Sequence, residues 1–322
     1  MQITDFTRDH IEPALDLVKA NYEKERQCVP SLPPMETFPK LDFFADNGLG
    51  VAAFENDVLV GFLGCYGPID NSFGTTGVKG NYVPVNGYGA VSENRERRYR
   101  RLYQAAAEKW VGSGIVSHVV SLYADDTVAV DTFFMNGFGL RTVEAVRQME
   151  EIDCSAVPGY LYRELGADRK AETLPLKNLL IDHLGSSPMF MPYPQMTESI
   201  LETQYQRRHP RYFTAHYEDR AVAWIEVING GENFVSFHES MKNICGASCL
   251  PEHRGKGVMQ NLLNLTITTL KSEVFTRLGV DFESFNPNAS GFWPKYFTPY
   301  IYGVVRRIDE YILNTNTARS EP

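Results

Sequence analysis

The chain has 322 residues, of which 43% are hydrophobic and 22% are charged. This composition is typical of a globular protein with room for two ordinary domains, and no run of about 18 apolar residues predicts a membrane helix. The formal net charge of −9 argues against non-specific nucleic-acid binding and suits a cationic substrate.

The amino terminus and the cysteines indicate the compartment. Residues 1–5 do not show the basic and then apolar pattern of a secretory signal, so we expect a cytoplasmic protein. Five cysteines, an odd and scattered number, do not form a disulfide framework. Cys245 and Cys249 have no second pair beside them, so we interpret them as packed thiols and expect no metal site.

Strand-like and helix-like segments alternate along the first half. The pattern predicts a strand at 3–6, a helix with apolar residues from 11 to 18, and a hairpin at 50–63 around Glu55, Asn56 and Asp57. Further on it predicts a strand at 82–91, a helix at 98–110, a strand at 119–123, an aromatic segment at 133–138 and a strand at 145–149. Because Glu96 interrupts the arginines at 95–101, we interpret this run as a solvated helix start and not as a nucleic-acid patch.

The second half repeats the same order, which indicates an internal duplication. Its predicted segments are a strand at 160–165, a helix at 174–184, a hairpin at 212–227, a strand at 244–250, a helix at 262–270, a strand at 280–286, an aromatic segment at 292–302 and a strand at 304–308. We therefore predict two domains, 1–157 and 158–322, joined near the Pro-Gly pair at 158–159.

A glycine-containing loop lies between the strand at 244–250 and the helix at 262–270. It reads Glu-His-Arg-Gly-Lys-Gly-Val-Met over residues 252–259. Glycines allow a close backbone approach, and the first unpaired N–H groups of a helix attract negative charge, so the loop suits a diphosphate. A solvated basic turn would have the same sequence, but the order strand, loop, helix, strand favours a nucleotide-tailed cofactor.

The spacing separates this loop from other phosphate loops. Gly257 is followed by Val258, so the P-loop pattern is absent, and the third glycine of the dinucleotide fingerprint is missing. The loop resembles that of the GNAT superfamily of acetyl-CoA-dependent N-acetyltransferases, in which Arg or Gln is followed three residues later by Gly and then, after one residue, by a small residue. Arg254 and Gly257 match, whereas Met259 replaces the small residue. The resemblance implies an α/β fold of two tandem GNAT-like domains, each with a mixed, mostly antiparallel sheet flanked by helices.

The resemblance also implies roles for individual residues. Acetyl-CoA would bind between two diverging parallel strands. Its thioester oxygen would accept a hydrogen bond from a backbone N–H near Cys249 or Leu250. Asn286 would bond the cofactor's amides, although a turn residue before Pro287 is an equal interpretation. The cofactor-binding candidates are Cys249, Leu250, Arg254, Gly255, Lys256, Gly257, Val258, Met259 and Asn286.

Catalysis requires a base for the ammonium and an acid for the leaving thiolate. We take Glu226 as the first candidate for the base, with His238 and Glu239 as alternatives, each equally readable as a solvated or packed polar residue. Strict alignment places Trp293 where the family often has Tyr, so Tyr296 is the candidate acid. We read the neighbouring aromatic residues Phe292 and Phe297 as core.

The first half lacks the glycine loop, since Arg98, Tyr99, Arg100 and Arg101 stand in its place. We predict that this half binds acetyl-CoA weakly or not at all. The predicted function is transfer of an acetyl group to a primary amine of a small molecule or peptide by the C-terminal domain, by direct attack in a ternary complex. The alternatives are a non-catalytic acyl-CoA-binding or interaction protein with this fold, and transfer of another acyl group.

Overall fold

The computed structural model describes residues 1–314, which form two compact units. Unit 1 comprises residues 1–30, 34–144 and the chain from Pro299 onward, and unit 2 comprises residues 31–33 and 145–298. The boundaries differ from the predicted domains 1–157 and 158–322 because two strands pass from one unit to the other. They are β8 (Gly139–Gln148) and β14 (Thr298–Arg307).

Unit 1 contains two sheets. The first has the strand order β1-β2-β3-β6 and is antiparallel throughout. The second has the order β4-β5-β7-β14, in which β5 and β7 are parallel. The bounds are β1 (Gln2–Asp5), β2 (Val51–Glu55), β3 (Val58–Leu63), β4 (Tyr66–Asp70), β5 (Lys79–Tyr82), β6 (Tyr88–Ala90) and β7 (Ile115–Tyr123).

Helices cover both faces of the first sheet of unit 1. Because side chains alternate along a strand, Val51 and Ala53 of β2 join the core beneath α3, whereas Ala52 joins the core beneath α1 and α2. The bounds are α1 (Ile11–Cys28), α2 (Asp42–Asp46), α3 (Arg95–Gly112) and α4 (Thr127–Met135).

The expected strand at 82–91 is broken in the structure into β5 and β6. Pro84 lies between them and has no N–H group to donate to a ladder, and Gly87 N donates to Pro84 O at 2.7 Å to form a turn. The two strands consequently join different sheets.

Glu25 of α1 is a buried carboxyl group in unit 1. Its two oxygens accept the N–H of Asp125 at 3.4 and 3.2 Å. Burial, reinforced by the Asp125 carboxylate, raises the pKa of Glu25 to about 8.

We expect this group to make the protein less stable as the pH rises. The folded state retains a proton that the unfolded state loses near pH 4.5, so stability falls by roughly 1.4 kcal/mol per pH unit between about 4.5 and 8. Urea unfolding at pH 5 and pH 8 should show this loss, and Glu25→Gln should reduce it. If the free energy of unfolding of the wild type and of Glu25→Gln changed equally with pH, Glu25 would not be the group responsible.

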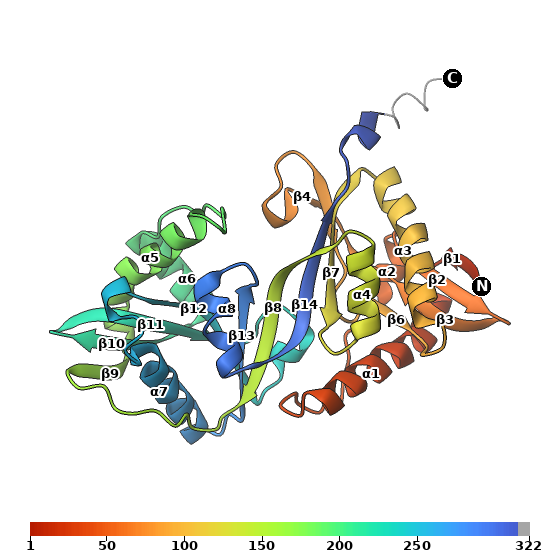
Figure 1. The fold of residues 1–322 in the computed structure, drawn as a ribbon. Coiled ribbons are helices and arrows are strands. Elements are labelled where there is room, and N and C mark those ends of the chain that lie inside the picture. Colours follow the sequence, from red (N-terminus) through yellow and green to blue (C-terminus); the bar gives the residue numbers. More distant parts are fainter. Residues whose placement is uncertain (315–322) are drawn as a thin grey trace. The chain divides into compact units, whose positions relative to one another are not determined.

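Unit 2 is built around one sheet with the order β13-β12-β11-β10-β9. All its neighbours are antiparallel except β12 and β13. Helices α5 and α6 cover one side and α7 the other (Figure 1). The bounds are β9 (Tyr160–Leu165), α5 (Leu174–Gly185), α6 (Glu198–Arg208), β10 (Arg211–Tyr217), β11 (Arg220–Ile228), β12 (Met241–Cys249), α7 (Val258–Ser272), β13 (Arg277–Glu283) and α8 (Pro287–Ser290).

The predicted hairpins are present in both units, and their turns have the same geometry. Asn56 and Asp57 have φ of 50° and 63°, and Glu218 and Asp219 have φ of 48° and 61°. Two consecutive residues with positive φ form the tight turn that matches the twist of a hairpin. The mixed, mostly antiparallel sheets flanked by helices confirm the predicted fold class.

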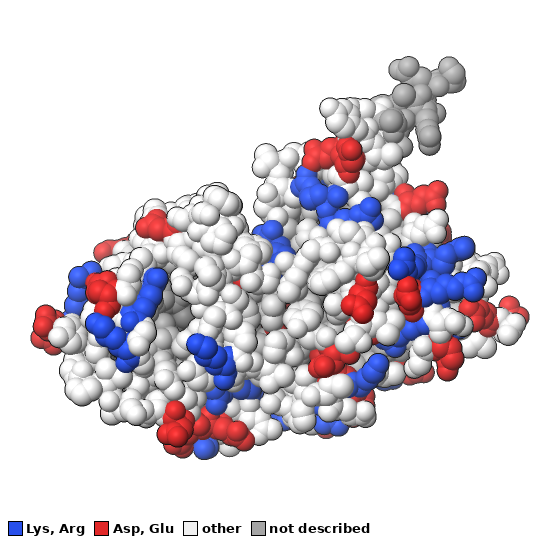
Figure 2. Space-filling view, viewed as in Figure 1, with Lys and Arg blue, Asp and Glu red and all other residues white. Residues whose placement is uncertain are grey.

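Charged side chains of both signs are interspersed on the face drawn in Figure 2. The arginines at the start of α3 follow this pattern, since Arg100 bonds Glu96 at 3.0 Å and Arg98 bonds Glu55 at 2.9 Å. In the described part of the chain, no helix has the length and apolar character needed to span a bilayer.

Candidate functional site

The parallel strands β12 and β13 diverge part of the way along unit 2. They pair from Met241 with Arg277 to Ile244 with Val280, although β12 continues to Cys249 and β13 to Glu283. The register of β12 against β11 shifts at the same point, which leaves Cys245 as an extra residue. A bulge bends a strand away from its neighbour, and this one opens the edge of β12 beyond Ile244.

The loop after β12 presents free amide groups to this opening. Gly255 and Gly257 have φ of 70° and 82°, a conformation that favours glycine, and Gly257 is the N-cap of α7. Among the described residues, none accepts a hydrogen bond from the backbone N–H groups of residues 255–259. Five unpaired donors at the start of a 15-residue helix form a site for an anion.

Two of the predicted binding groups have other partners in the structure. The N–H of Leu250 donates to Val222 O at 2.9 Å, so it is not available to a thioester oxygen. Because hydrogen-bonding direction alternates along a strand, the N–H of Cys249 faces the open edge. Arg254 Nε donates to Cys249 O at 2.9 Å, so this side chain holds the loop against the strand end in addition to providing charge.

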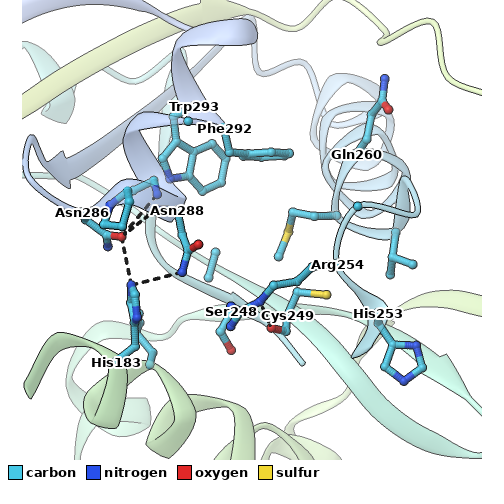
Figure 3. A pocket seen from close by; sticks show the side chains of 18 of the residues that line it. His183, Ser248, Cys249, His253, Arg254, Gln260, Asn286, Asn288, Phe292 and Trp293 are labelled. Carbon is cyan, nitrogen blue, oxygen red and sulfur yellow. Dashed lines mark hydrogen bonds between the residues drawn. The ribbon is translucent and has the colours of Figure 1, made fainter. Parts of the chain in front are cut away.

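A cavity of about 490 Å³ lies between the diverging strands, the loop, α5 and α8 (Figure 3). Its size is that of a small-molecule site. The ionisable residues that line it in the described chain are His183, Cys249, His253, Arg254, Lys295 and Tyr296. None is an Asp or Glu, so the lining suits an anionic ligand in a protein whose net charge is −9.

Most of the predicted cofactor residues line this cavity. They are Cys249, Arg254, Gly255, Gly257, Val258, Met259 and Asn286. Leu250 and Lys256 do not line it, and Lys256 is exposed on the loop.

Asn286 is buried, and its side-chain oxygen has three partners. Asn286 Oδ1 accepts the N–H of Asn288 at 3.2 Å and of Ala289 at 3.4 Å, which caps α8, and it lies 3.0 Å from His183 Nε2 (Figure 3). This matches the turn interpretation of Asn286, and the amide Nδ2 remains as a donor for a ligand.

An aromatic wall closes the cavity opposite the strands. Phe292, Trp293 and Tyr296 line it, with the Phe292 ring 4.9 Å from that of Trp293 and 5.0 Å from that of Tyr296. Phe292, expected in the core, is therefore at the site, whereas Phe297 is buried as expected. Burial raises the pKa of Tyr296, which keeps its phenol protonated.

Glu226, the first candidate for the base, does not line the cavity. Its carboxylate forms a buried ion pair with Lys177, whose Nζ lies 4.4 Å from the Trp224 ring centre. The alternatives His238 and Glu239 are also absent from the lining, and His238 Nδ1 lies 2.8 Å from Ser240 Oγ. The structure thus brings none of the three predicted bases to the cavity.

His183 and Asn288 line the cavity but were missed from the sequence. One signal was present, since Leu179, Leu180 and His183 share one face of a helix and all three line the cavity. A single histidine on an apolar helix face is a weak signal without the neighbouring strand ends.

In unit 1 the residues expected in place of the loop, Arg98 to Arg101, lie within α3 and not before it. The buried Arg95 at the start of α3 bonds Asp126 at 2.7 Å and Asn21 at 2.8 Å and lies over the Tyr99 ring. Its charge is therefore neutralised within the protein.

Comparisons with known proteins agree with this architecture. Residues 180–297 match the Acetyltransferase (GNAT) family. Comparison with curated sequences gave no match. Among solved structures, the chain is similar to a GCN5-related N-acetyltransferase from Sphaerobacter thermophilus, with a TM-score of 0.57, 10% identity and coverage of 95% of each chain.

Two further structures have lower scores. An acetyltransferase from the GNAT family of Colwellia psychrerythraea has a TM-score of 0.46 and 13% identity, with 96% of this chain and 100% of that one covered. A tandem GNAT protein from the clavulanic acid biosynthesis pathway has a TM-score of 0.47 and 13% identity, with 96% of this chain and 98% of that one covered.

The fold and the site thus combine a mixed sheet, two parallel strands that open, and a glycine loop beside the opening. Over residues 180–297 this architecture coincides with the match to the GNAT acetyltransferase family. The predicted resemblance is confirmed.

Proposed function

We propose that unit 2 transfers an acetyl group from acetyl-CoA to a primary amine of a small molecule or peptide by direct attack in a ternary complex. The observation that supports this most is the set of five free amides at residues 255–259, beside the open edge of β12. In the same proposal, the chain is a tandem duplication with halves 1–157 and 158–322. All five cysteines are free, which suits a cytoplasmic location.

The residues of the cavity fit coenzyme A. The amides of residues 255–259 and the positive end of α7 would hold the diphosphate, with Arg254 and the exposed Lys256 adding positive charge. The open edge of β12 from Cys245 to Cys249 would pair with the amide-containing pantetheine arm, as an added strand does. Asn286 Nδ2 is placed to donate to the same arm.

Acetyl-CoA, when bound, supplies an acetyl group activated as a thioester. The N–H of Cys249 would donate to the thioester oxygen as negative charge develops on it. The phenol of Tyr296 would give its proton to the leaving sulfur. Phe292 and Trp293 would exclude water from the reacting groups. Glu226 has no part in this proposal because its carboxylate is committed to Lys177.

We expect one acetyl-CoA site per chain, because the loop of unit 2 has free amides and glycines, whereas the start of α3 in unit 1 has the buried Arg95, which is paired with Asp126. Isothermal titration calorimetry should give a stoichiometry of one. Two equal, saturable sites would contradict the assignment of unit 1.

We expect the wild-type protein to release free thiol from acetyl-CoA when at least one suitable amine is present. The test panel is tyramine, spermidine, glucosamine, lysine and a peptide with a free amino terminus. Gly257→Glu should abolish this release. Saturable binding without thiol release from any amine would instead support a non-catalytic acyl-CoA-binding protein, a function encouraged by Met259 in the loop and by Trp293 at the position where the family often has Tyr.

A further inference from the structure

We infer that His183 is the general base that takes the proton of the acceptor ammonium, an inference that rests on the proposed function. The starting point is the composition of the cavity. No Asp or Glu of the described chain lines it, so a proton must be accepted by another group. His183 and His253 are the lining side chains of the type that exchanges protons near neutral pH.

The two histidines differ in position and in partners. His253 belongs to the glycine loop, and its Nδ1 lies 2.7 Å from Tyr160 Oη. His183 projects from α5 towards the end of β13, beside Asn286 and Asn288 (Figure 3). It therefore faces the cavity from the side opposite α7, away from the amides that would hold the diphosphate.

The hydrogen bonds of Asn286 determine which nitrogen of His183 carries the proton. Asn286 Oδ1 accepts two backbone N–H groups, so its oxygen, and not its nitrogen, must face the ring. His183 Nε2, at 3.0 Å from this oxygen, must then be the donor. Asn288 Nδ2 lies 3.2 Å from the same nitrogen, so a proton on Nε2 requires the Asn288 amide to be turned with its oxygen towards the ring.

This arrangement leaves Nδ1 of His183 with a lone pair. Among the described residues, no hydrogen-bond partner contacts Nδ1. Asn286 thus serves as a positioning residue that fixes the tautomer and the ring orientation, and its oxygen stabilises the imidazolium that forms when Nδ1 accepts a proton.

The proton balance of the step is complete. The ammonium gives one proton to His183 Nδ1, and the freed amine lone pair forms the new C–N bond with the acetyl carbon. The C–S bond breaks, its electron pair leaves with the sulfur, and Tyr296 protonates the sulfur. The second amine proton leaves as the amide forms and restores the phenol of Tyr296, and the imidazolium of His183 then releases its proton to solvent.

The other ionisable groups around His183 come from several elements. The loop before α7 contributes His253 and Arg254, β12 contributes Cys249, and the segment after α8 contributes Lys295 and Tyr296. On α5 itself, Lys177 is paired with Glu226 of β11, and Asp182 accepts from Gln195 at 2.6 Å. Neither carboxylate, Glu226 or Asp182, lines the cavity, so neither is placed to replace His183 as the base.

The test compares His183→Gln with the wild-type protein. Gln can still donate to Asn286 but accepts no proton at neutral pH. With the fastest amine of the panel, we expect kcat/KM to fall by ~100-fold or more and the rise of rate with pH to be lost. With methoxyamine, which is uncharged at neutral pH and needs no base before attack, the loss should be much smaller.

Three controls separate the possible outcomes. Calorimetry should show that His183→Gln binds acetyl-CoA as the wild type does, and His238→Gln, the same change outside the cavity, should leave both amine rates unchanged. Nitrogen-15 NMR of the imidazoles should find the His183 proton on Nε2. A proton on Nδ1, or equal losses of rate for both amines, would overturn the role of His183 and leave the proposed function standing. Absence of thiol release by the wild-type protein would overturn the proposed function and this inference with it.

Discussion

Gly257→Glu should remove acetyl-CoA binding almost completely. Gly257 has φ of 82°, and a Cβ there would lie 3.3 Å from Val157 Cγ2 and 3.8 Å from Asn261 Nδ2, so any side chain strains the loop. The added carboxylate would also stand at the helix N-terminus, where a negative charge at about 4 Å repels a phosphate by roughly 4 kcal/mol at an effective dielectric constant of 20. We expect the Kd for acetyl-CoA, measured by calorimetry, to rise by at least ~100-fold.

Two matched variants separate charge from strain. Gly257→Ala introduces the same Cβ without charge and should weaken binding less. Gly48→Glu in unit 1 introduces the same charge at φ of 70°, with no atom within 4 Å of the new Cβ, and should leave the Kd unchanged. Wild-type affinity in Gly257→Glu would show that the diphosphate binds elsewhere.

Lys177→Met should be strongly destabilising. Lys177 and Glu226 are both about 5% exposed, and removal of the cation leaves a buried carboxylate without its partner. Breaking a buried pair in this way costs about 3–5 kcal/mol. Urea unfolding should show this loss, and the double variant Lys177→Met/Glu226→Leu should recover most of it because both charges are then absent.

The double variant also tests the role of Glu226. Under conditions where it is folded, it should still release thiol from acetyl-CoA with an amine, since His183 and not Glu226 is the inferred base. Lys170→Met is the matched control, because Lys170 pairs with the half-exposed Glu202 at 2.9 Å and such pairs contribute at most about 1 kcal/mol. Equal destabilisation by the two lysine variants, or loss of activity in the double variant, would contradict this account.

Local sequence was sufficient for most elements of the fold. The mostly apolar runs of β10 and β11 and the polar pair Glu218-Asp219 between them indicate a hairpin without reference to the rest of the chain. The glycine loop was also recognisable, because residues 254–257 and the flanking strand and helix lie next to one another in sequence. Its resemblance to the GNAT family is confirmed over residues 180–297.

Contacts between distant residues were not readable in the same way. Glu226 has the residue type and the strand position expected of a base, but only its approach to Lys177 on α5 shows that it is buried and paired. His183 is remote in sequence from Asn286, and the two meet only because α5 packs on β12 and β11, which brings His183 to the turn after β13.

The sequence by itself determined the duplicated order of elements, the two-residue hairpin turns and the glycine loop before α7, since each depends on backbone preferences within a few residues. Tertiary structure alone decided that β14 pairs with β7, that β12 leaves β13 after Ile244, and which side chains line the cavity. The reason is that strand pairing and side-chain burial depend on contacts between segments far apart in the chain, which the periodicity of one segment does not encode.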